Sequence, residues 1–330
     1  MKAINNIFCK NNLAIISLLC TSAYILSACQ KNNTGPSGNI VKPDTLSTGW
    51  QKIIIPGNGD LKDIVFKDNA TGYLSGFGTF KTVDGGITWN RISVRNFTNI
   101  ALTSANSYYV RASDTIWVNA NTDTLFIPVA LQGPAYAIDV QFLDNLNGFC
   151  ITANGLFQTV DGGLSWQKII SNLPISFILT TLFFQNINKG WIVSNSSILY
   201  NSGGLNNWIH CIITGKDANS YFNAISAEFN NVIYATTNFG EVLKSTDNGH
   251  NFSVIKKFPG IINTNCDIHF LNETTGYVSP GNEIYKTTDG GNNWTRIVAL
   301  GDAQFYEIHF TDLNHGWACG TKGTVLVFQQ

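Results

Sequence analysis

Short runs of alternating apolar and polar residues make up most of the chain after residue 48, and glycine-rich turns separate many of them. The turn has the form Ser/Thr-x-Asp-x-Gly-x-x-aromatic at residues 82–89, 159–166, 245–252 and 287–294. A period of two predicts β-strands with one buried face, and Asp-Gly or Gly-Gly supplies the positive φ angles of a tight hairpin turn. We therefore predict successive hairpins, and no run after residue 30 has a helical period.

A second pattern recurs ahead of these turns, an aromatic residue followed by another seven positions later. Clear copies are Phe66/Tyr73, Phe142/Phe149, Phe184/Trp191, Phe270/Tyr277 and Phe310/Trp317, and weaker copies begin at Leu102 and Ala227. Successive copies start 36 to 43 residues apart, which gives seven units. Roughly 40 residues holding four short strands is the length of a β-propeller blade.

The last unit stops at Gln330, before it can supply a fourth strand. Residues 48–55, Thr-Gly-Trp-Gln-Lys-Ile-Ile-Ile, have the pattern of the strand that follows each turn, as in residues 166–170. Pairing this first strand with the last unit would remove an open edge at the seam. We therefore predict an all-β fold, a seven-bladed β-propeller over residues 48–330 whose N-terminal strand closes the last blade.

The repeated turn resembles the Asp box of bacterial neuraminidase repeats. Together with its Asp-Ile-x-Phe and Gly-aromatic strands, the chain resembles the photosystem II assembly and stability factor family over about residues 48–330. The resemblance implies a seven-bladed propeller that binds a membrane-protein partner through a positively charged surface. The chain departs from this expectation because it has only four arginines.

The N-terminus predicts export and a lipid anchor. Lys2 and Lys10 precede an apolar run from Leu13 to Leu26, as in a secretory signal peptide. The run ends in Leu-Ser-Ala-Cys29, which resembles the bacterial lipobox. We predict a lipoprotein signal peptide over 1–28 and a lipidated Cys29 that begins a flexible tether over 29–47. The predicted location is the cell envelope, at the outer membrane, facing the periplasm or the outside; an ordinary signal peptide is the alternative.

Charge and cysteine content narrow the picture further. The chain has 20 Lys+Arg and 21 Asp+Glu, which argues against nucleic-acid binding and against membrane binding other than through the lipid anchor. Four cysteines lie in the predicted propeller: Cys150, Cys211, Cys266 and Cys319. They could pair in three ways, but they fall in four different units at unrelated strand positions. Cys150 and Cys319 are predicted in second strands, which favours a buried free thiol at these two positions.

Acidic residues lie three positions before the first aromatic of several units, namely Asp63, Asp139, Asp267 and Glu307. They begin the innermost strands, so they should surround one mouth of the central channel, on the face opposite the repeated turns. One hypothesis is a ring of acids that attracts a cation or a basic peptide segment. The alternative is that each acid caps the backbone of a link between units or is solvated at a strand end.

His269 and His309 follow two of these acids by two residues. They are weak candidates for metal ligands, because no HxH or HxxxH spacing concentrates ligands. The repeated turns lie away from the face that propellers usually use for ligands, so their acids and aromatics are assigned a structural role: Asp84, Trp89, Asp161, Trp166, Asp247, Phe252, Asp289 and Trp294.

No phosphate-binding loop, nucleophile elbow or Cys/His cluster appears, and we assign no catalytic residue and no cofactor. A sialidase would need convergent arginines and a Phe-Arg-Ile-Pro motif, which the chain lacks. The sequence leaves catalysis open but favours a monomeric, non-catalytic scaffold for a protein partner, foremost an envelope membrane protein. The alternative is a carbohydrate-binding or glycoside-hydrolysing surface lipoprotein, in which aromatics between units, such as Phe97, Tyr221 and Tyr306, form a platform.

Overall fold

The computed structural model describes residues 43–104, 107–111, 115–119, 125–131, 137–170, 173, 178–201, 203–205, 207–229 and 231–330. The predicted signal peptide, Cys29 and the tether as far as residue 42 lie outside these residues. Strands dominate the described part, whose helical content is the short 3-10 turn η1 (Thr321–Gly323). No described helix is both long and apolar enough to cross a membrane.

The described strands form seven sheets, numbered I to VII in the chain order of their innermost strands. Sheet I has β3 (Leu61–Phe66), β4 (Gly72–Gly76), β5 (Thr79–Thr82) and β6 (Asn90–Ser93); sheet II has β7 (Asn99–Leu102), β8 (Ser107–Arg111), β9 (Thr115–Asn119) and β10 (Phe126–Ala130). Sheet III has β11 (Ala137–Phe142), β12 (Gly148–Thr152), β13 (Gly155–Thr159) and β14 (Gln167–Ile170); sheet IV has β15 (Leu179–Asn186), β16 (Lys189–Ser194), β17 (Ile198–Asn201) and β18 (Trp208–His210). Sheet V has β20 (Phe222–Phe229), β21 (Val232–Thr237), β22 (Glu241–Ser245), β23 (Asn251–Lys257) and an outer β19 (Ile212–Thr214). Sheet VI has β24 (Cys266–Phe270), β25 (Gly276–Pro280), β26 (Glu283–Thr287), β27 (Thr295–Ala299) and an outer β1 (Thr45–Leu46); sheet VII has β28 (Phe305–Phe310), β29 (His315–Gly320), β30 (Thr324–Gln329) and β2 (Trp50–Ile54).

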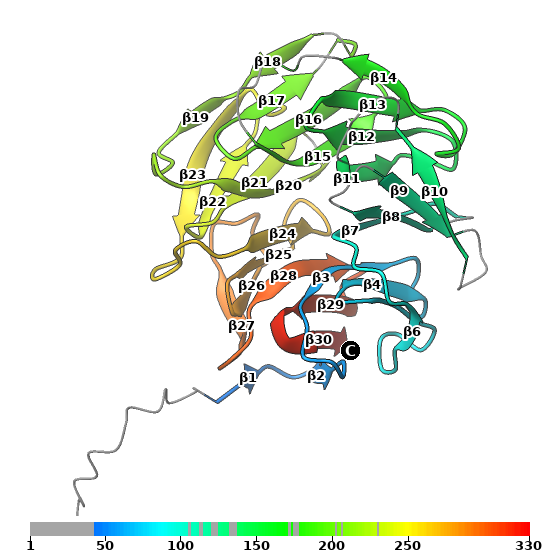
Figure 1. The fold of residues 1–330 in the computed structure, drawn as a ribbon. Coiled ribbons are helices and arrows are strands. Elements are labelled where there is room, and N and C mark those ends of the chain that lie inside the picture. Colours follow the sequence, from blue (N-terminus) through cyan, green and yellow to red (C-terminus); the bar gives the residue numbers. More distant parts are fainter. Residues whose placement is uncertain are drawn as a thin grey trace, which may run out of the picture. The chain divides into compact units, whose positions relative to one another are not determined.

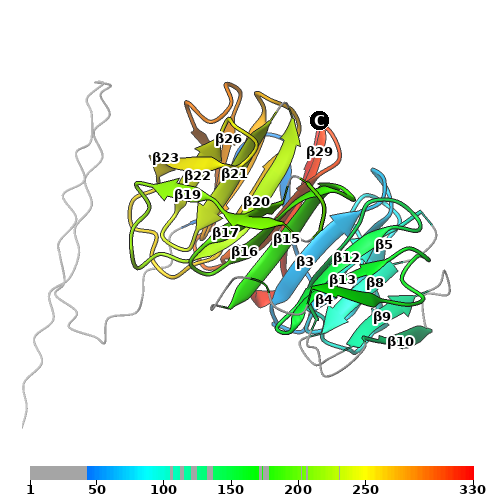
Figure 2. The same ribbon diagram turned by 90° about the horizontal axis from the view of Figure 1, so that it is seen from above.

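The sheets surround a common centre (Figures 1 and 2). The innermost strands β3, β7, β11, β15, β20, β24 and β28 each contact the innermost strand of the next sheet, and β28 contacts β3. Strands joined by the predicted hairpin turns run antiparallel, as in β13 and β14. The fold is therefore an all-β propeller.

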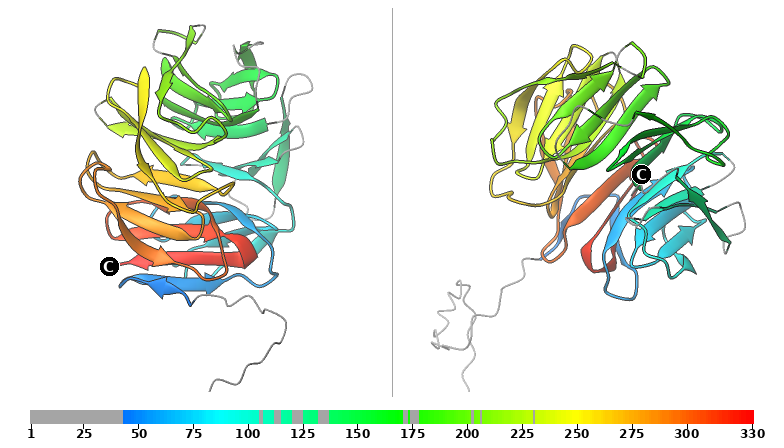
Figure 3. Two further views of the ribbon diagram at one scale, coloured as in Figure 1. Left: turned by 90° about the vertical axis from the view of Figure 1, so that its left-hand side faces the viewer. Right: turned by 45° about the horizontal axis from the view of Figure 1, so that its top comes forward.

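The first strands of the domain lie beside its last ones (Figure 3). Strand β2 pairs antiparallel with β30, from Trp50 opposite Phe328 to Ile54 opposite Thr324, as the sequence predicts. The predicted end of the tether is wrong by a few residues, because β1 (Thr45–Leu46) pairs antiparallel with β27. A two-residue strand carries too little alternation to be recognised from sequence.

The aromatic residues spaced by seven join neighbouring sheets. The first aromatic of a unit stacks on the second aromatic of the preceding unit, with ring centroids 3.5–3.8 Å apart: Phe184 on Phe149, Phe270 on Tyr234, Phe310 on Tyr277 and, across the seam, Phe66 on Trp317. The glycine before the second aromatic leaves room for the first aromatic of its own unit. At Gly316, for example, a Cβ would lie 2.1 Å from Phe310.

The four described cysteines, Cys150, Cys211, Cys266 and Cys319, are buried and unpaired. This confirms the prediction for Cys150 and Cys319. Cys150 lies in β12 and Cys319 in β29, which are the second strands of their sheets. Both side chains pack in the hydrophobic core as small apolar groups.

The two faces of the propeller carry different turns. On one face, the turn between the first and second strands bonds to the turn between the third and fourth strands: Gly85 N to Ala70 O, Gly162 N to Leu146 O and Gly290 N to Thr274 O, each at 2.9 Å. We call this the Asp-turn face, because the four repeated turns lie on it, and we call those turns the Asp turns. The opposite face, the link face, carries the second-to-third turns and the connections between sheets.

Candidate functional site

The acid of each Asp turn is used by the turn itself. Asp84 accepts hydrogen bonds from Thr88 N (2.9 Å) and from the hydroxyls of Thr82 (2.8 Å) and Thr88 (2.5 Å). Asp161 makes the same contacts in its turn. Asp247 and Asp289 make the equivalent contacts, with the side-chain amides of Asn251 and Asn293 in place of the Thr88 hydroxyl. The paired glycines have the left-handed φ that the pattern predicts, 75° at Gly85 and 90° at Gly86. These contacts support a structural role for the four acids.

The aromatic that ends each Asp turn packs in one of two ways. Trp166 and Phe252 are buried in the core. Trp89 and Trp294 are half-buried, and their indole N–H groups donate to Gly86 O and Gly291 O in the same turn, at 2.9 and 3.0 Å. Each aromatic therefore fixes its turn to the sheet beneath it.

The four predicted acids lie on the innermost strands, and three of them bond to the next sheet. Asp63 accepts from Ile100 N (2.6 Å) and Asp267 from Ile308 N (2.9 Å). Asp139 accepts from Leu182 N (3.0 Å) and from the Thr181 hydroxyl (2.7 Å). We call Asp63, Asp139 and Asp267 the bridging acids. The sequence suggested that each acid caps a link or is solvated at a strand end, whereas these three acids accept from the innermost strand of the neighbouring sheet.

Burial changes the charge of these acids. It raises the pKa of Asp63 to about 7 and that of Asp267 to about 6, although hydrogen bonds from Ile100 N and Ile308 N oppose the shift. It also raises the pKa of Asp139. Burial, followed by the charges of the bridging acids, raises the pKa of Glu307 well above its usual range. The four acids together carry fewer than four negative charges at neutral pH.

The acids line a polar cavity at the centre of the propeller. This cavity has a volume of about 280 Å³ and is lined by Asp63, Asp139, Asp267, Glu307, Asn99 and His309, among others. A second cavity of about 260 Å³ shares Asp267 and Glu307 with it and is lined also by Lys62, Asn223, Asn265 and Tyr306. The structure thus brings together all four acids that the sequence singles out.

Lys62 and Tyr306 form part of the wall of the second cavity. The Lys62 ammonium lies 3.7 Å from the centre of the Tyr306 ring. Both groups also reach Asp60, which accepts from Lys62 Nζ (3.1 Å) and from the Tyr306 hydroxyl (3.0 Å). Burial alone would lower the pKa of Lys62, but its contacts with Tyr306 and Asp60 raise it. A cation therefore stands beside the cavity that the acids line.

The two histidines form a pair on the neighbouring innermost strands β24 and β28. The rings of His269 and His309 have centroids 5.6 Å apart. Burial lowers the pKa of His269 to about 4 and that of His309 to about 3, although bonds to the backbone of Phe310 and Phe66 on the next sheets oppose the shift. No group of three or more metal-binding side chains occurs among the described residues. Both histidines thus bond to the backbone of the next sheet. Gln141 makes similar bonds, since it accepts from Phe184 N (2.6 Å) and donates to Phe184 O (3.0 Å) on the next sheet.

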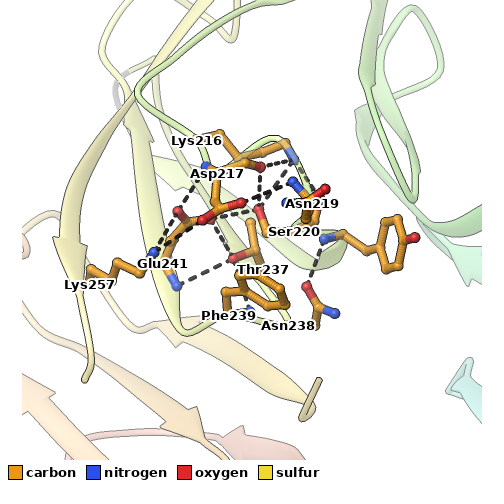
Figure 4. Close-up of polar contacts among 10 residues, drawn as sticks. Lys216, Asp217, Asn219, Ser220, Thr237, Asn238, Phe239, Glu241 and Lys257 are labelled. Atoms are coloured by element: carbon orange, nitrogen blue, oxygen red, sulfur yellow. Dashed lines mark hydrogen bonds and ion pairs between the residues drawn. The ribbon is translucent and has the colours of Figure 1, made fainter. Parts of the chain in front are cut away.

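Sequence reasoning missed a polar network on the link face (Figure 4). Glu241 is buried and accepts from Asp217 N (2.9 Å), the Ser220 hydroxyl (2.7 Å) and the Thr237 hydroxyl (2.8 Å). Burial alone would raise the pKa of Glu241, but these hydrogen bonds lower it. The network fixes the loop ahead of β20, where Tyr221 is exposed. No repeated motif marks Glu241, so the sequence offered no signal for it.

The fold and these contacts define a class of protein: a repeat propeller whose Asp turns and bridging acids hold the sheets together around a polar centre. A match to a family model identifies the family within this class. The model for the photosynthesis system II assembly factor YCF48 matches residues 118–263 and 170–302, which together span more than half of the chain. The chain belongs to this family.

Curated relatives match shorter stretches. The chain is 29% identical over 128 residues to the photosystem II assembly lipoprotein Ycf48 of Synechococcus sp. (strain CC9902), a match that covers 38% of each chain. Its counterpart in Prochlorococcus marinus (strain MIT 9312) is 29% identical over 82 residues, or 24% of each chain. Both matches span less than half of the relatives' length.

Solved structures match the fold over most of its length. The structure described as YCF48 bound to D1 peptide has a TM-score of 0.71 at 19% identity and covers 87% of this chain and 99% of that one. Virginiamycin B lyase from Staphylococcus aureus has a TM-score of 0.70 at 13% identity, with 85% and 99% covered. At these identities the likeness establishes the fold alone.

Proposed function

We propose that this protein is a lipid-anchored, extracytoplasmic scaffold for assembly, which binds a segment of an envelope membrane protein without catalysis. The family match carries the proposal, because the family is that of an assembly factor. A related propeller, YCF48, accepts a D1 peptide. A protein segment is therefore the partner that we favour for this chain.

The proposed architecture has seven blades, one for each sheet. Its support is the contact of each innermost strand with the next, including β28 with β3, and the pairing of β2 with β30. The lipid anchor is supported by the lipobox-like sequence at Cys29 and by two relatives that are named lipoproteins. We propose a signal peptide over 1–28, a tether from Cys29 to about residue 42, and attachment to the outer membrane.

We place the binding site on the link face, over the two central cavities. Lys62, Tyr306, Asn223 and Asn265 supply an ammonium, a hydroxyl and two amides there. The acids beneath are partly protonated because burial raises their pKa, so they can donate as well as accept hydrogen bonds. Such a mixture of donors and acceptors suits the backbone and polar side chains of an extended peptide.

The site differs from the positively charged surface that the family resemblance implies. Arg91 lies on the outer strand β6 and donates to Phe77 O (2.8 Å), and Arg296 on β27 pairs with Glu283 (2.7 Å). These arginines serve the outer parts of their own sheets. We therefore propose a partner that differs in charge from the partners of the family's photosynthetic members.

The carbohydrate alternative receives less support. Among the described residues in the links between sheets, Phe97, Phe258 and Phe305 are buried, so they seal the core and do not contribute to an aromatic platform. Tyr221 is exposed and Tyr306 is half-buried. Two separated tyrosines are a weaker sugar-binding surface than a row of exposed rings.

The test uses residues 30–330 as bait on detergent-solubilised envelopes of the native host. Three baits are compared: wild type, a mouth variant with Lys62→Glu and Tyr306→Ala, and a control with Lys168→Glu on the outer strand β14. Melting curves of all three show whether each bait is folded. We expect a membrane protein that wild type and control capture and the mouth variant loses. Equal capture by all three folded baits would overturn the proposed site, and capture of no membrane protein would overturn the proposed partner.

A further inference from the structure

Exposed aliphatic side chains gather at the tips of turns on the Asp-turn face. Those in sheets I, III and VII are 40–74% exposed: Val83, Ile87, Leu146, Val160, Leu164 and Leu313. We call these six residues the aliphatic arc. Single exposed aliphatics are common on protein surfaces, so the question is whether these belong to one continuous surface.

Hydrogen bonds connect the turns that carry the arc. Asn69 donates to Asp312 (3.0 Å), which joins the turn of Leu313 to sheet I. Lys67 Nζ then donates to Ser104 O, and Ser104 N to Asn145 Oδ1 (2.8 Å), which joins sheet I through sheet II to sheet III. Each Asp turn bonds to the first turn of its own sheet, as Gly85 N to Ala70 O and Gly162 N to Leu146 O. The arc is therefore carried by one connected set of turns.

The repeats provide an internal control for the arc. In the Asp turns of sheets V and VI, the positions of Val83 and Ile87 are taken by Thr246 and His250 and by Thr288 and Asn292. Asp247 and Asp289 nevertheless accept the same backbone hydrogen bond as Asp84, from the residue four positions later. The turn thus folds equally well with polar tips, and its geometry does not require the aliphatic side chains of sheets I and III.

Carboxylates stand between the aliphatic tips: Asp68, Asp84, Asp144, Asp161 and Asp312. Backbone hydrogen bonds lower the pKa of Asp68 and Asp144. Burial alone would raise the pKa of Asp84, Asp161 and Asp312, but the hydrogen bonds that these carboxylates accept outweigh burial and lower it. In the same described turns, Lys67 carries the opposite charge, and His315 Nδ1 lies 2.9 Å from Asp312 Oδ1. The arc is thus apolar and negatively charged.

We propose that the aliphatic arc docks a basic amphipathic segment of a partner protein, whose apolar side chains meet the arc and whose Lys or Arg side chains meet its carboxylates. Charge complementarity selects this occupant. A bilayer would have to accept five carboxylates, and a second copy of the arc would bring like charges together. The surface lies on the face opposite the cavities, so it goes beyond the function proposed above.

The test measures binding of a fluorescent peptide of leucine and lysine with helical spacing, by anisotropy, to residues 30–330. Two control peptides replace every lysine with glutamate or every leucine with serine. The arc variant carries Val83→Thr, Ile87→Asn, Val160→Thr and Leu164→Asn, which install the residues of the Asp turn in sheet VI. The matched control carries Val94→Thr and Ile178→Asn at two exposed positions on the link face.

We expect the leucine–lysine peptide to bind wild type and the link-face control alike, to bind the arc variant about tenfold or more weakly, and to weaken with added salt. The control peptides should bind poorly to all three. Equal binding of the arc variant, or of the glutamate peptide, would overturn the proposal. Loss in the arc variant of binding to phosphatidylglycerol vesicles would instead identify a lipid surface, and loss of self-association in sedimentation would identify a second copy. The mouth variant should keep peptide binding, so this test fails independently of the capture experiment.

Discussion

Strand β2 offers a direct test of how the propeller closes. It places five residues of the N-terminal segment in register with β30, the last strand of the chain. Trp50 is buried there against Phe310 and Phe328, with ring centroids 6.1 and 5.1 Å away. Deleting residues 48–56 would remove both the ladder and the indole. We therefore expect the deletion to open sheet VII along β30.

The size of the effect follows from the burial of Trp50. A buried aromatic removes about 150–250 Å² from water, which at about 25 cal/mol per Å² stabilises the fold by about 4–6 kcal/mol. Replacement of a buried tryptophan by alanine in other cores costs about 3–5 kcal/mol. We expect Trp50→Ala to fall in that range. The deletion should cost more, because the ladder adds about 1 kcal/mol for each backbone hydrogen bond lost.

Urea unfolding followed by circular dichroism measures these losses, with Ile54→Ala as the matched control. Ile54 lies on the same strand but is exposed, so its truncation should change the free energy of unfolding by less than about 0.5 kcal/mol. Sedimentation of the deletion variant would report whether the uncovered edge of β30 pairs with another copy. A deletion variant with the urea midpoint and melting temperature of wild type would refute closure by β2.

Further predictions concern the core, the turns and the central acids. Trp166→Ala should lower the free energy of unfolding by about 3–5 kcal/mol because the side chain is buried, and an unchanged urea midpoint would show that it is not core. Asp161→Asn should cost only about 1 kcal/mol, since asparagine keeps an oxygen for the turn; a loss as large as that of Trp166→Ala would contradict this. Stability should fall as pH rises from about 4 to about 7, because unfolded Asp63 releases its proton at lower pH than the folded group, whose pKa is about 7. Asp63→Asn should flatten this fall, by at most about 4 kcal/mol, and parallel pH curves for the two proteins would show that Asp63 is not linked to it.

Much of the fold could be predicted from the sequence, because the same strand and turn pattern occurs in several repeats. The Asp turns gave the hairpins, and the strand-like pattern of residues 48–55 gave the pairing of β2 with β30. The partners in aromatic stacking could not be predicted. Phe66 and Trp317, for example, lie almost a whole chain apart in the sequence, and only the closed fold brings them together. Strand β1 was not predicted, because two residues are too few to show an alternation of apolar and polar positions.

The candidate site was only partly readable. The position of Asp63, Asp139, Asp267 and Glu307 within the repeats predicted that they lie near one another. The structure shows that they line one cavity. Spacing did not reveal that Asp63 accepts a backbone N–H from the next sheet, since that contact depends on how two sheets pack. Nor did it reveal that burial leaves the group partly protonated near neutral pH. A list of acids in a sequence contains no information on dielectric surroundings.

The unequal lengths of β1 and β2 have a mechanical consequence. The described chain begins at residue 43 and enters the domain through β1, which pairs only Thr45 and Leu46 with β27 and is held also by the contact of Asp44 with Lys52 at 2.7 Å. A pulling force on the preceding segment would load these few bonds first. They would yield before the five-residue ladder of β2 and its buried Trp50. The short strand would therefore let the segment ahead of β2 lengthen under tension while β2 keeps the propeller closed.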